Sequence, residues 1–356
     1  MEYIKLGNSD LTVSRICLGS ATWGNQNSEA QSHEQMDYAL NKGVNFIDTA
    51  EIYPLPPSPE AYGRSEEMIG NWLQSRKNRN DIVLATKVSP RPWARNENDP
   101  KINRENIIMA VDGSLQRLKT DYIDLYQLHW PTNRDTYHFS NWWDFDSSNC
   151  TGKKQAIIDN HIEILETLST LSKEGKIKHI GLSNDTSWGI KSYCDLSEKY
   201  NLPKIVSVQN EYSLLRRRDE TDLMEACSLE GVSYLSWSPL EMGVISGKYL
   251  NGLRPEGARF SGNVLHGYED GFSSRITTHL DASVQAYIDI AKNHNLDVCQ
   301  MAIAFTLRNK NMSCSIIGAT TMDQLKSNID SHTLKLSDEV LNDINMVQNL
   351  HPTPLG

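Results

Sequence analysis

The chain has 356 residues, of which 38% are hydrophobic and 22% charged, and its formal net charge is -10. This length suits one large α/β barrel or two average domains, and the composition is ordinary for a globular protein in water. The acidic balance argues against sequence-independent nucleic-acid binding, which requires a basic face.

The amino terminus and the cysteines predict a cytoplasmic location. The first residues, MEYIKLGNSD, lack the basic and apolar regions of a signal peptide, and no run of about 18 apolar residues could span a membrane. The six cysteines are scattered without a C-x-x-C pair, which indicates reduced thiols rather than disulfides or a zinc site. We expect no nucleic-acid or membrane partner, and a monomer or weak homo-oligomer.

Short apolar runs rich in β-branched residues recur along the chain and predict buried parallel strands. In chain order they cover residues 16–18, 44–47, 82–85, 122–128, 177–182, 205–208, 232–235 and 314–317. Amphipathic helical patterns lie between them, for example over 103–119 and 156–173, where apolar residues recur on one face. The chain therefore alternates strands with helices over most of its length.

This alternation predicts an α/β protein with the (β/α)8 TIM barrel fold. The alternative is an open doubly wound sheet, which normally carries G-x-G-x-x-G after its first strand, but residues 19–24 read GSATWG. No repeat or linker divides the chain, so we expect a single domain over 1–356. Three long connections, 50–63, 89–102 and 131–155, follow predicted strands and should lie at the carboxyl-terminal face of the barrel.

The last of these connections is a long loop insertion over 131–155. It contains Trp142 and Trp143, shortly after Trp130. Aromatic residues on a loop at this face could form the wall of a substrate pocket, and they could equally be a packed surface loop.

Polar residues stand at the ends of successive predicted strands: Asp48 with Tyr53 five residues later, then Lys87, then His129. Strand ends of one barrel converge, so we expect these four side chains to meet. A tyrosine has a pKa of about 10, and a nearby ammonium would bring that pKa toward neutrality. Asp48 would balance the buried lysine, and His129 would orient a carbonyl oxygen. The set predicts a site that protonates an oxygen while hydride reaches the adjacent carbon, with Tyr53 as acid in reduction and base in oxidation.

Each of these residues also has an ordinary structural explanation. Asp48 could cap a turn, Lys87 could be a solvated charge at a strand end, and His129 could be a hydrogen-bonded neighbour of Trp130. Singly, these explanations are preferred. The joint occurrence of the four, in order and at successive strand ends, favours an active site.

Several segments of the chain, in a common order, resemble the aldo-keto reductases. They are NFIDTA at 45–50 with Tyr53, ATK at 85–87, DYIDLYQLHWP at 121–131, IGLSN at 180–184, QNEYSLL at 209–215, SWSPL at 236–240, GKY at 247–249 and IGATT at 317–321. The resemblance spans nearly the whole chain and is strongest to the bacterial Tas-type group, through Tyr53-Pro54 and GATTMDQL at 318–325. It implies reduction of aldehydes or ketones with NADPH, by hydride from nicotinamide C4, and the catalytic tetrad Asp48, Tyr53, Lys87 and His129.

The same resemblance implies where cofactor and substrate bind. The nicotinamide would stack on Trp237, with its carboxamide on Ser183, Asn184 and Gln209, whose polar side chains suit an amide. The other implied cofactor contacts are Thr22, Trp23, Asp48, Ser238, Pro239, Leu240, Gly243, Ser246, Lys248, Arg259, Ile317, Gly318, Thr320, Gln324 and Asn328. The implied substrate contacts are Trp23, Tyr53, His129 and Trp130.

One departure from the family concerns the adenosine 2′-phosphate. Many members place a lysine and an arginine there, whereas this chain has Gly318 and Gln324. Members without those cations use hydroxyl and glutamine side chains, which match Thr320 and Gln324, together with the pair matching Lys248 and Arg259. We therefore expect NADPH to be preferred over NADH. Gln324 also follows a threonine by three residues, the spacing of a capping box.

Two other functions fit parts of the sequence. The potassium-channel β subunits share the fold and the WSPL segment at 237–240, and such a protein would bind NADP(H) as a regulatory subunit with little turnover. The intact tetrad and the lack of an extended amino-terminal segment favour the enzyme. A metal-dependent barrel enzyme ranks lower because Asp48 and His129 are not joined by further ligands at strand ends, and we expect no metal site.

Overall fold

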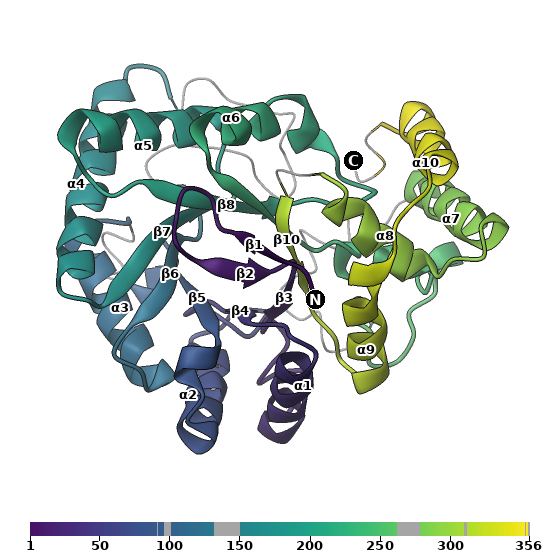
Figure 1. Cartoon of the computed structure of the whole chain (residues 1–356), viewed down its shortest axis with the longest axis horizontal. Helices are drawn as coiled ribbons and strands as arrows, with labels where there is room; N and C mark the ends of the chain where they lie inside the picture. Colours follow the sequence, from purple (N-terminus) through teal and green to yellow (C-terminus); the bar gives the residue numbers. More distant parts are fainter. Residues whose placement is uncertain are drawn as a thin grey trace.

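The computed structural model describes residues 1–90, 92–95, 101–131, 150–261, 278–309, 312–352 and 354. Eight parallel strands close into a barrel in the order β10-β3-β4-β5-β6-β7-β8-β9 (Figure 1). Their bounds are β3 (Ile16–Gly19), β4 (Phe46–Asp48), β5 (Val83–Val88), β6 (Ile123–Leu128), β7 (Ile177–Ser183), β8 (Ile205–Glu211), β9 (Ser233–Trp237) and β10 (Met312–Ile317). The predicted TIM barrel is confirmed, and each predicted strand is present within a few residues of its expected bounds.

Helices surround the barrel and follow the strands in sequence (Figure 1). They are α1 (Glu29–Asn41), α2 (Arg64–Arg76), α3 (Arg104–Leu118), α4 (Lys154–Lys173), α5 (Ser187–Tyr200), α6 (Leu223–Glu230), α8 (Val298–Leu307) and α9 (Met322–Asp330). Two further helices, α7 (Thr278–Asn293) and α10 (Asp338–Leu350), pack against each other outside this ring. Within the described residues, every helix is too short or too polar to cross a membrane.

A short hairpin that the sequence analysis did not predict closes the amino-terminal end of the barrel. Its strands β1 (Tyr3–Lys5) and β2 (Thr12–Ser14) pair antiparallel and lie across the barrel opening in Figure 1. Leu6, Leu11 and Val13 of this segment are buried in one cluster with inward-facing residues of the barrel strands. Because this end is sealed by apolar packing, the opposite end is the one available for a site.

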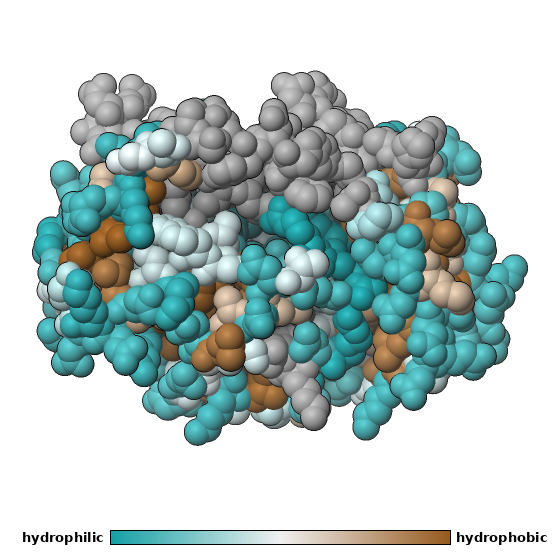
Figure 2. Space-filling model, turned by 90° about the horizontal axis from the view of Figure 1, so that it is seen from above, coloured by the Kyte–Doolittle hydropathy of each residue, from teal (hydrophilic) through white to brown (hydrophobic). Residues whose placement is uncertain are grey.

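The three long connections predicted after the strands differ in how much of their structure is described. Residues 50–63 fold into turns above β4, and residues 92–94 of the second connection form a short 3-10 helix, η2 (Pro92–Ala94). The predicted insertion over 131–155 falls largely on residues 132–149, so Trp142 and Trp143 lie outside the described residues. Among the residues drawn in colour in Figure 2, most are hydrophilic and the hydrophobic ones form small separate areas, as is usual for globular proteins.

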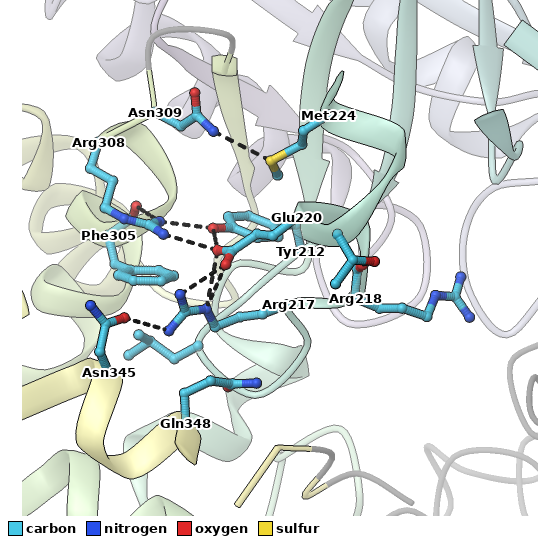
Figure 3. Close-up of polar contacts among 12 residues, drawn as sticks. Tyr212, Arg217, Arg218, Glu220, Met224, Phe305, Arg308, Asn309, Asn345 and Gln348 are labelled. Carbon is cyan, nitrogen blue, oxygen red and sulfur yellow. Dashed lines mark hydrogen bonds and ion pairs between the residues drawn. The ribbon is translucent and has the colours of Figure 1, made fainter. Parts of the chain in front are cut away.

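An ion-pair cluster fastens the outer helices to the barrel (Figure 3). Its centre is Glu220, which pairs with Arg217 at 2.8 Å and with Arg308 at 2.9 Å. Burial opposes ionisation of Glu220, but hydrogen bonds from Arg217 and Tyr212 outweigh burial and lower its pKa. Arg217 also donates to Asn345 of α10 at 3.0 Å. The cluster therefore holds α10 in place and does not belong to the cavity described below.

Close packing of α2 against α3 depends on a glycine, and we expect Gly70→Ala to destabilise the fold. An added methyl group would lie 2.1 Å from the carbonyl oxygen of Arg117 and 2.8 Å from the carbonyl carbon of Leu118, so the two helices would have to separate. The expected loss is about 1–3 kcal/mol in the free energy of unfolding, measured by urea denaturation. The control is Gly113→Ala on α3, whose methyl would meet the end of the Arg117 side chain at 3.0 Å and no backbone atom. Equal stabilities of the two variants would contradict this packing argument.

Candidate active site

A cavity of about 1380 Å³ opens at the carboxyl-terminal ends of the barrel strands. Six strands contribute residues at or near their carboxyl ends to its wall: Gly19, Asp48, Ser183, Gln209, Trp237 and Ile317. Loops that follow the strands, together with residues of α8 and α9, supply most of the rest of the wall. The cavity is therefore at the end of the barrel where a (β/α)8 enzyme carries its active site.

A buried ion pair lies at the base of this cavity. Lys87 is fully buried, and its ammonium donates to Asp48 Oδ2 at 2.6 Å and to the carbonyl oxygen of Thr49 at 2.7 Å. The other carboxylate oxygen of Asp48 accepts hydrogen bonds from Gln127 at 3.1 Å and Gln209 at 2.8 Å. These partners satisfy two charges that would otherwise be costly to bury. A solvated Lys87 is thus excluded as an explanation for this residue.

Tyr53 approaches this pair from the loop after β4. The Lys87 ammonium lies 5.2 Å from the centroid of the Tyr53 ring, and the His129 ring meets it edge-on with a centroid distance of 5.8 Å. Tyr53 and His129 both line the cavity, with Asp48 beside them. The structure therefore brings the four predicted side chains together at one point of the cavity wall.

The pKa of Tyr53 is raised, and not lowered toward neutrality as the sequence analysis expects. Burial raises the pKa of Tyr53 well above its usual value, and the nearby Asp48 carboxylate raises it further, while Arg259 opposes the shift. The causes acting on this pKa are burial, Asp48 and Arg259, whereas the Lys87 ammonium is in direct contact with Asp48. The phenol is therefore protonated at neutral pH, which suits a proton donor and disfavours the tyrosinate.

His129 is held on three sides. Its Nδ1 lies 2.8 Å from the hydroxyl oxygen of Ser89, and its ring stacks on Trp130 with centroids 3.9 Å apart. Its backbone N–H donates to Val88, and its carbonyl accepts from the side chain of Asn184, both at 2.9 Å. These contacts fix the ring at the cavity wall, where Trp130 and Trp93 form an aromatic surface beside it.

The polar residues expected near a nicotinamide are linked to one another. The indole N–H of Trp237 donates to Asn184 Oδ1 at 3.2 Å, and the Ser183 hydroxyl donates to the carbonyl oxygen of Gln209 at 2.9 Å. All four line the cavity, as does Thr22, whose hydroxyl donates to Asn27 Oδ1 at 2.8 Å. This end of the cavity offers an indole face next to several amide groups.

Trp23 does not take the expected position. Its side chain is fully buried away from the cavity, and its indole N–H donates to Gln35 of α1 at 3.0 Å. It therefore packs between the barrel and α1 and does not line the cavity in which the predicted contacts with cofactor and substrate would be made. The preceding residue, Thr22, does reach the cavity because the chain turns sharply there.

Farther along the cavity, the side chains of Lys248 and Arg259 and a loop of small residues form the wall. The loop includes the predicted residues Ser238, Pro239, Leu240, Gly243 and Ser246, all of which line the cavity. Lys248 and Arg259 also line it, and within the described ranges neither forms an ion pair. Burial lowers the pKa of Lys248, and the positive charge of Arg259 lowers it further. Two neighbouring cations of this kind would be stabilised by an anionic ligand.

The far end of the cavity is formed by the start of α9. Five residues that are predicted to contact the cofactor line the cavity here: Ile317, Gly318, Thr320, Gln324 and Asn328. Gln324 Oε1 accepts from the backbone N–H of Thr320 at 3.0 Å and from its hydroxyl at 3.1 Å. The capping box is therefore only half formed: the backbone N–H of Gln324 donates to the side chain of the N-cap Thr321, but the glutamine side chain turns to Thr320 instead.

Some residues of the site were not predicted from sequence. Gln127 could have been noticed as a polar residue inside an apolar strand, since such residues usually have a specific partner. Ser89 lies just after β5 and gave no signal of its own. Two acidic residues also line the cavity, Asp297 at the amino-terminal cap of α8 and Asp323 in the first turn of α9, and they add negative charge to this part of the wall.

Fold and site together define an oxidoreductase built on a (β/α)8 barrel. The model of the Aldo/keto reductase family matches residues 15–349, and the chain belongs to this family. It is 42% identical to Protein tas of Escherichia coli (strain K12), over 99% of each chain, and 31% identical to the Uncharacterized oxidoreductase YrpG of Bacillus subtilis (strain 168), over 100% of this chain and 98% of that protein. An Aldo-keto reductase of Babesia bovis is 34% identical over 75% of this chain and 95% of its own length.

Within the described part of the chain, no group of three or more histidine, cysteine, aspartate and glutamate side chains is placed to hold a metal ion.

Proposed function

We propose that this protein reduces aldehyde or ketone carbonyl groups to alcohols with NADPH, and that Tyr53 is the general acid. The observation that carries the proposal is the position of the Tyr53 phenol, kept protonated by burial, beside His129 and above the Asp48–Lys87 pair in one cavity. A positioned proton donor of this kind accelerates carbonyl reduction by about 10² to 10⁴.

The cavity residues fit a nicotinamide dinucleotide. When bound, NADPH would supply hydride from nicotinamide C4. Trp237 and the neighbouring amides would hold the nicotinamide, Lys248 and Arg259 the phosphates, and the Thr320–Gln324 pair the adenosine side. The loop of small residues allows backbone N–H groups close approach to an anion.

The substrate carbonyl would lie between Tyr53 and His129. Its oxygen would accept a hydrogen bond from His129 and the proton from Tyr53, while the Lys87–Asp48 pair keeps the base of the site polar and fixed. Trp130 and Trp93 would cover the apolar part of the substrate. In this arrangement the protein places one donor for orientation and one for proton transfer.

The direct test is oxidation of NADPH by the purified protein with a panel of aldehydes, ketones, quinones and sugars, run beside NADH. We expect turnover of several carbonyls and a lower KM for NADPH than for NADH. A lower KM for NADH would assign the acidic end at Asp297 and Asp323 to recognition of a free ribose. Tight NADPH binding without turnover of any carbonyl would contradict the proposal and favour a regulatory subunit that only binds the cofactor.

Lys248→Met should weaken NADPH binding without loss of the fold. A charge-assisted hydrogen bond to phosphate is worth about 1.5–3 kcal/mol, so the dissociation constant for NADPH should rise about 10- to 150-fold. Added salt should reduce the difference in affinity between the variant and the unmodified protein. Quenching of tryptophan fluorescence on titration with NADPH measures both dissociation constants. Lys173→Met, at the exposed end of α4, is the matched control and should bind as the unmodified protein does. Equal affinities in the two variants would exclude Lys248 from the phosphate site.

A further inference from the structure

A buried serine lies behind His129 and has no part in the proposed reaction as described above. Ser89 follows β5, is fully buried, and is separate from the cavity wall. Its hydroxyl oxygen lies 2.8 Å from His129 Nδ1, on the side of the ring that faces the protein interior. Since Nδ1 is engaged there, Nε2 is the ring nitrogen on the opposite side, where His129 borders the cavity.

The direction of this hydrogen bond follows from the groups around the hydroxyl. A serine hydroxyl has a single proton, and a buried hydroxyl proton needs an acceptor. Within the described ranges, His129 Nδ1 is the polar atom within hydrogen-bond distance of the Ser89 hydroxyl, so donation in the opposite direction would leave that proton without an acceptor. The backbone N–H of Ser89 is used separately, on Glu51 Oε1 at 2.7 Å. The hydroxyl therefore donates to Nδ1, Nδ1 keeps its lone pair, and the proton of the neutral imidazole resides on Nε2.

We propose that Ser89 is a positioning residue that fixes His129 as the neutral Nε2–H tautomer, so that the ring presents a hydrogen-bond donor to the cavity. The assignment of the tautomer stands on the Ser89 contact alone. Its use, donation to a substrate carbonyl oxygen, rests on the proposed function. In the other tautomer Nε2 would present a lone pair to the carbonyl oxygen, and the orienting hydrogen bond would be lost.

A buried carboxylate, that of Glu51, holds the backbone of Ser89 in the position from which its hydroxyl reaches His129. Glu51 is fully buried and accepts from the Ser89 backbone N–H, from the Tyr62 hydroxyl at 2.5 Å and from Arg95. Burial raises the pKa of Glu51, whereas Arg95, Tyr62 and the Ser89 N–H stabilise its charged form.

The same carboxylate connects the two halves of the site. Glu51 is two residues before Tyr53, and its carbonyl oxygen accepts from Gly63 at 2.8 Å, at the end of the same loop. The loop that carries the proton donor and the strand end that orients the imidazole therefore share one anchor. This shared anchor keeps the distance between Tyr53 and His129 fixed.

The test is the protonation state of each His129 ring nitrogen, read by ¹⁵N NMR with the resonances assigned by loss of signal in His129→Gln. In the unmodified protein at about pH 8, where an ordinary imidazole is neutral, we expect Nε2 to give the signal of a protonated nitrogen and Nδ1 that of an unprotonated one. An Nδ1–H tautomer at this pH would overturn the proposal. This measurement needs no variant at Ser89 and no substrate.

Ser89→Ala should convert this signature to a mixture of tautomers, and Ser89→Thr, which keeps the hydroxyl, should restore it. The matched control is Ser207→Ala, which removes another fully buried hydroxyl, one without a hydrogen-bond partner in the described structure. That control should leave the ring signals unchanged. Unchanged signals in Ser89→Ala as well would show that Ser89 does not set the tautomer.

Kinetics separate this inference from the proposed function. Ser89→Ala should lower kcat/KM for carbonyl substrates about 10- to 100-fold with an unchanged dissociation constant for NADPH, as is typical when a group that orients a reacting residue is removed. If the unmodified protein shows the Nε2–H signature but reduces no carbonyl, the tautomer assignment holds and the proposed function fails. If it reduces carbonyls with the opposite tautomer, the proposed function holds and the role of Ser89 fails.

Discussion

Replacing Tyr53 with phenylalanine should abolish nearly all carbonyl reduction while NADPH binding persists. The substitution keeps the ring against His129 and removes only the proton donor, so kcat should fall by about 10² to 10⁴. Single-turnover reduction with saturating NADPH measures the chemical step, and fluorescence titration measures the affinity. The control is Tyr287→Phe, which removes another buried phenol hydroxyl, bonded to the carbonyl of Leu214 at 3.0 Å and remote from the cavity.

The pH dependence of the unmodified protein tests the same assignment. The protonated phenol is the active form in reduction, and burial raises the pKa of Tyr53 above its ordinary value of about 10. Loss of activity through ionisation of this phenol should therefore begin only above about pH 10. A reductase rate that falls between about pH 7 and 9 in the unmodified protein but not in Tyr53→Phe would place the phenol's pKa lower than the structure does. Wild-type rates in Tyr53→Phe would remove Tyr53 from the reaction altogether.

Lys87→Met should combine a large loss of stability with a large loss of activity. The variant leaves the Asp48 carboxylate buried without its ammonium, and breaking a buried pair in this way costs about 3–5 kcal/mol. Urea denaturation near pH 7 measures the free energy of unfolding. The exposed Lys173→Met should change it by less than about 0.5 kcal/mol.

The double variant Lys87→Met with Asp48→Asn separates the two effects. Without any buried charge it should recover much of the lost stability, because the asparagine oxygen can still accept from Gln127 or Gln209. Activity should not return, since the polar base of the site is gone. Additive stability losses in the double variant would show that Lys87 and Asp48 do not interact energetically, contrary to their 2.6 Å contact.

Several features of the site depended on residues far apart in the sequence. Asp48 is bound by Gln209, 161 positions later, and the tautomer of His129 depends on Ser89, 40 positions earlier. The raised pKa of Tyr53 arises from burial, which a local pattern does not report. The same holds for Trp23, whose side chain turned to α1 rather than to the cavity.

The sequence by itself determined the barrel and the positions of the tetrad. The periodicity of strands and helices depends on residues that are close together in the sequence, so it could be recognised there. Because all strands of a (β/α)8 barrel end on one face, polar residues at strand ends such as Asp48, Lys87 and His129 could be expected to meet. The hairpin of β1 and β2 was missed because strands of three residues carry no measurable alternation. Only the tertiary structure decided which way side chains point and how far they are desolvated, since packing and burial are properties of the whole chain.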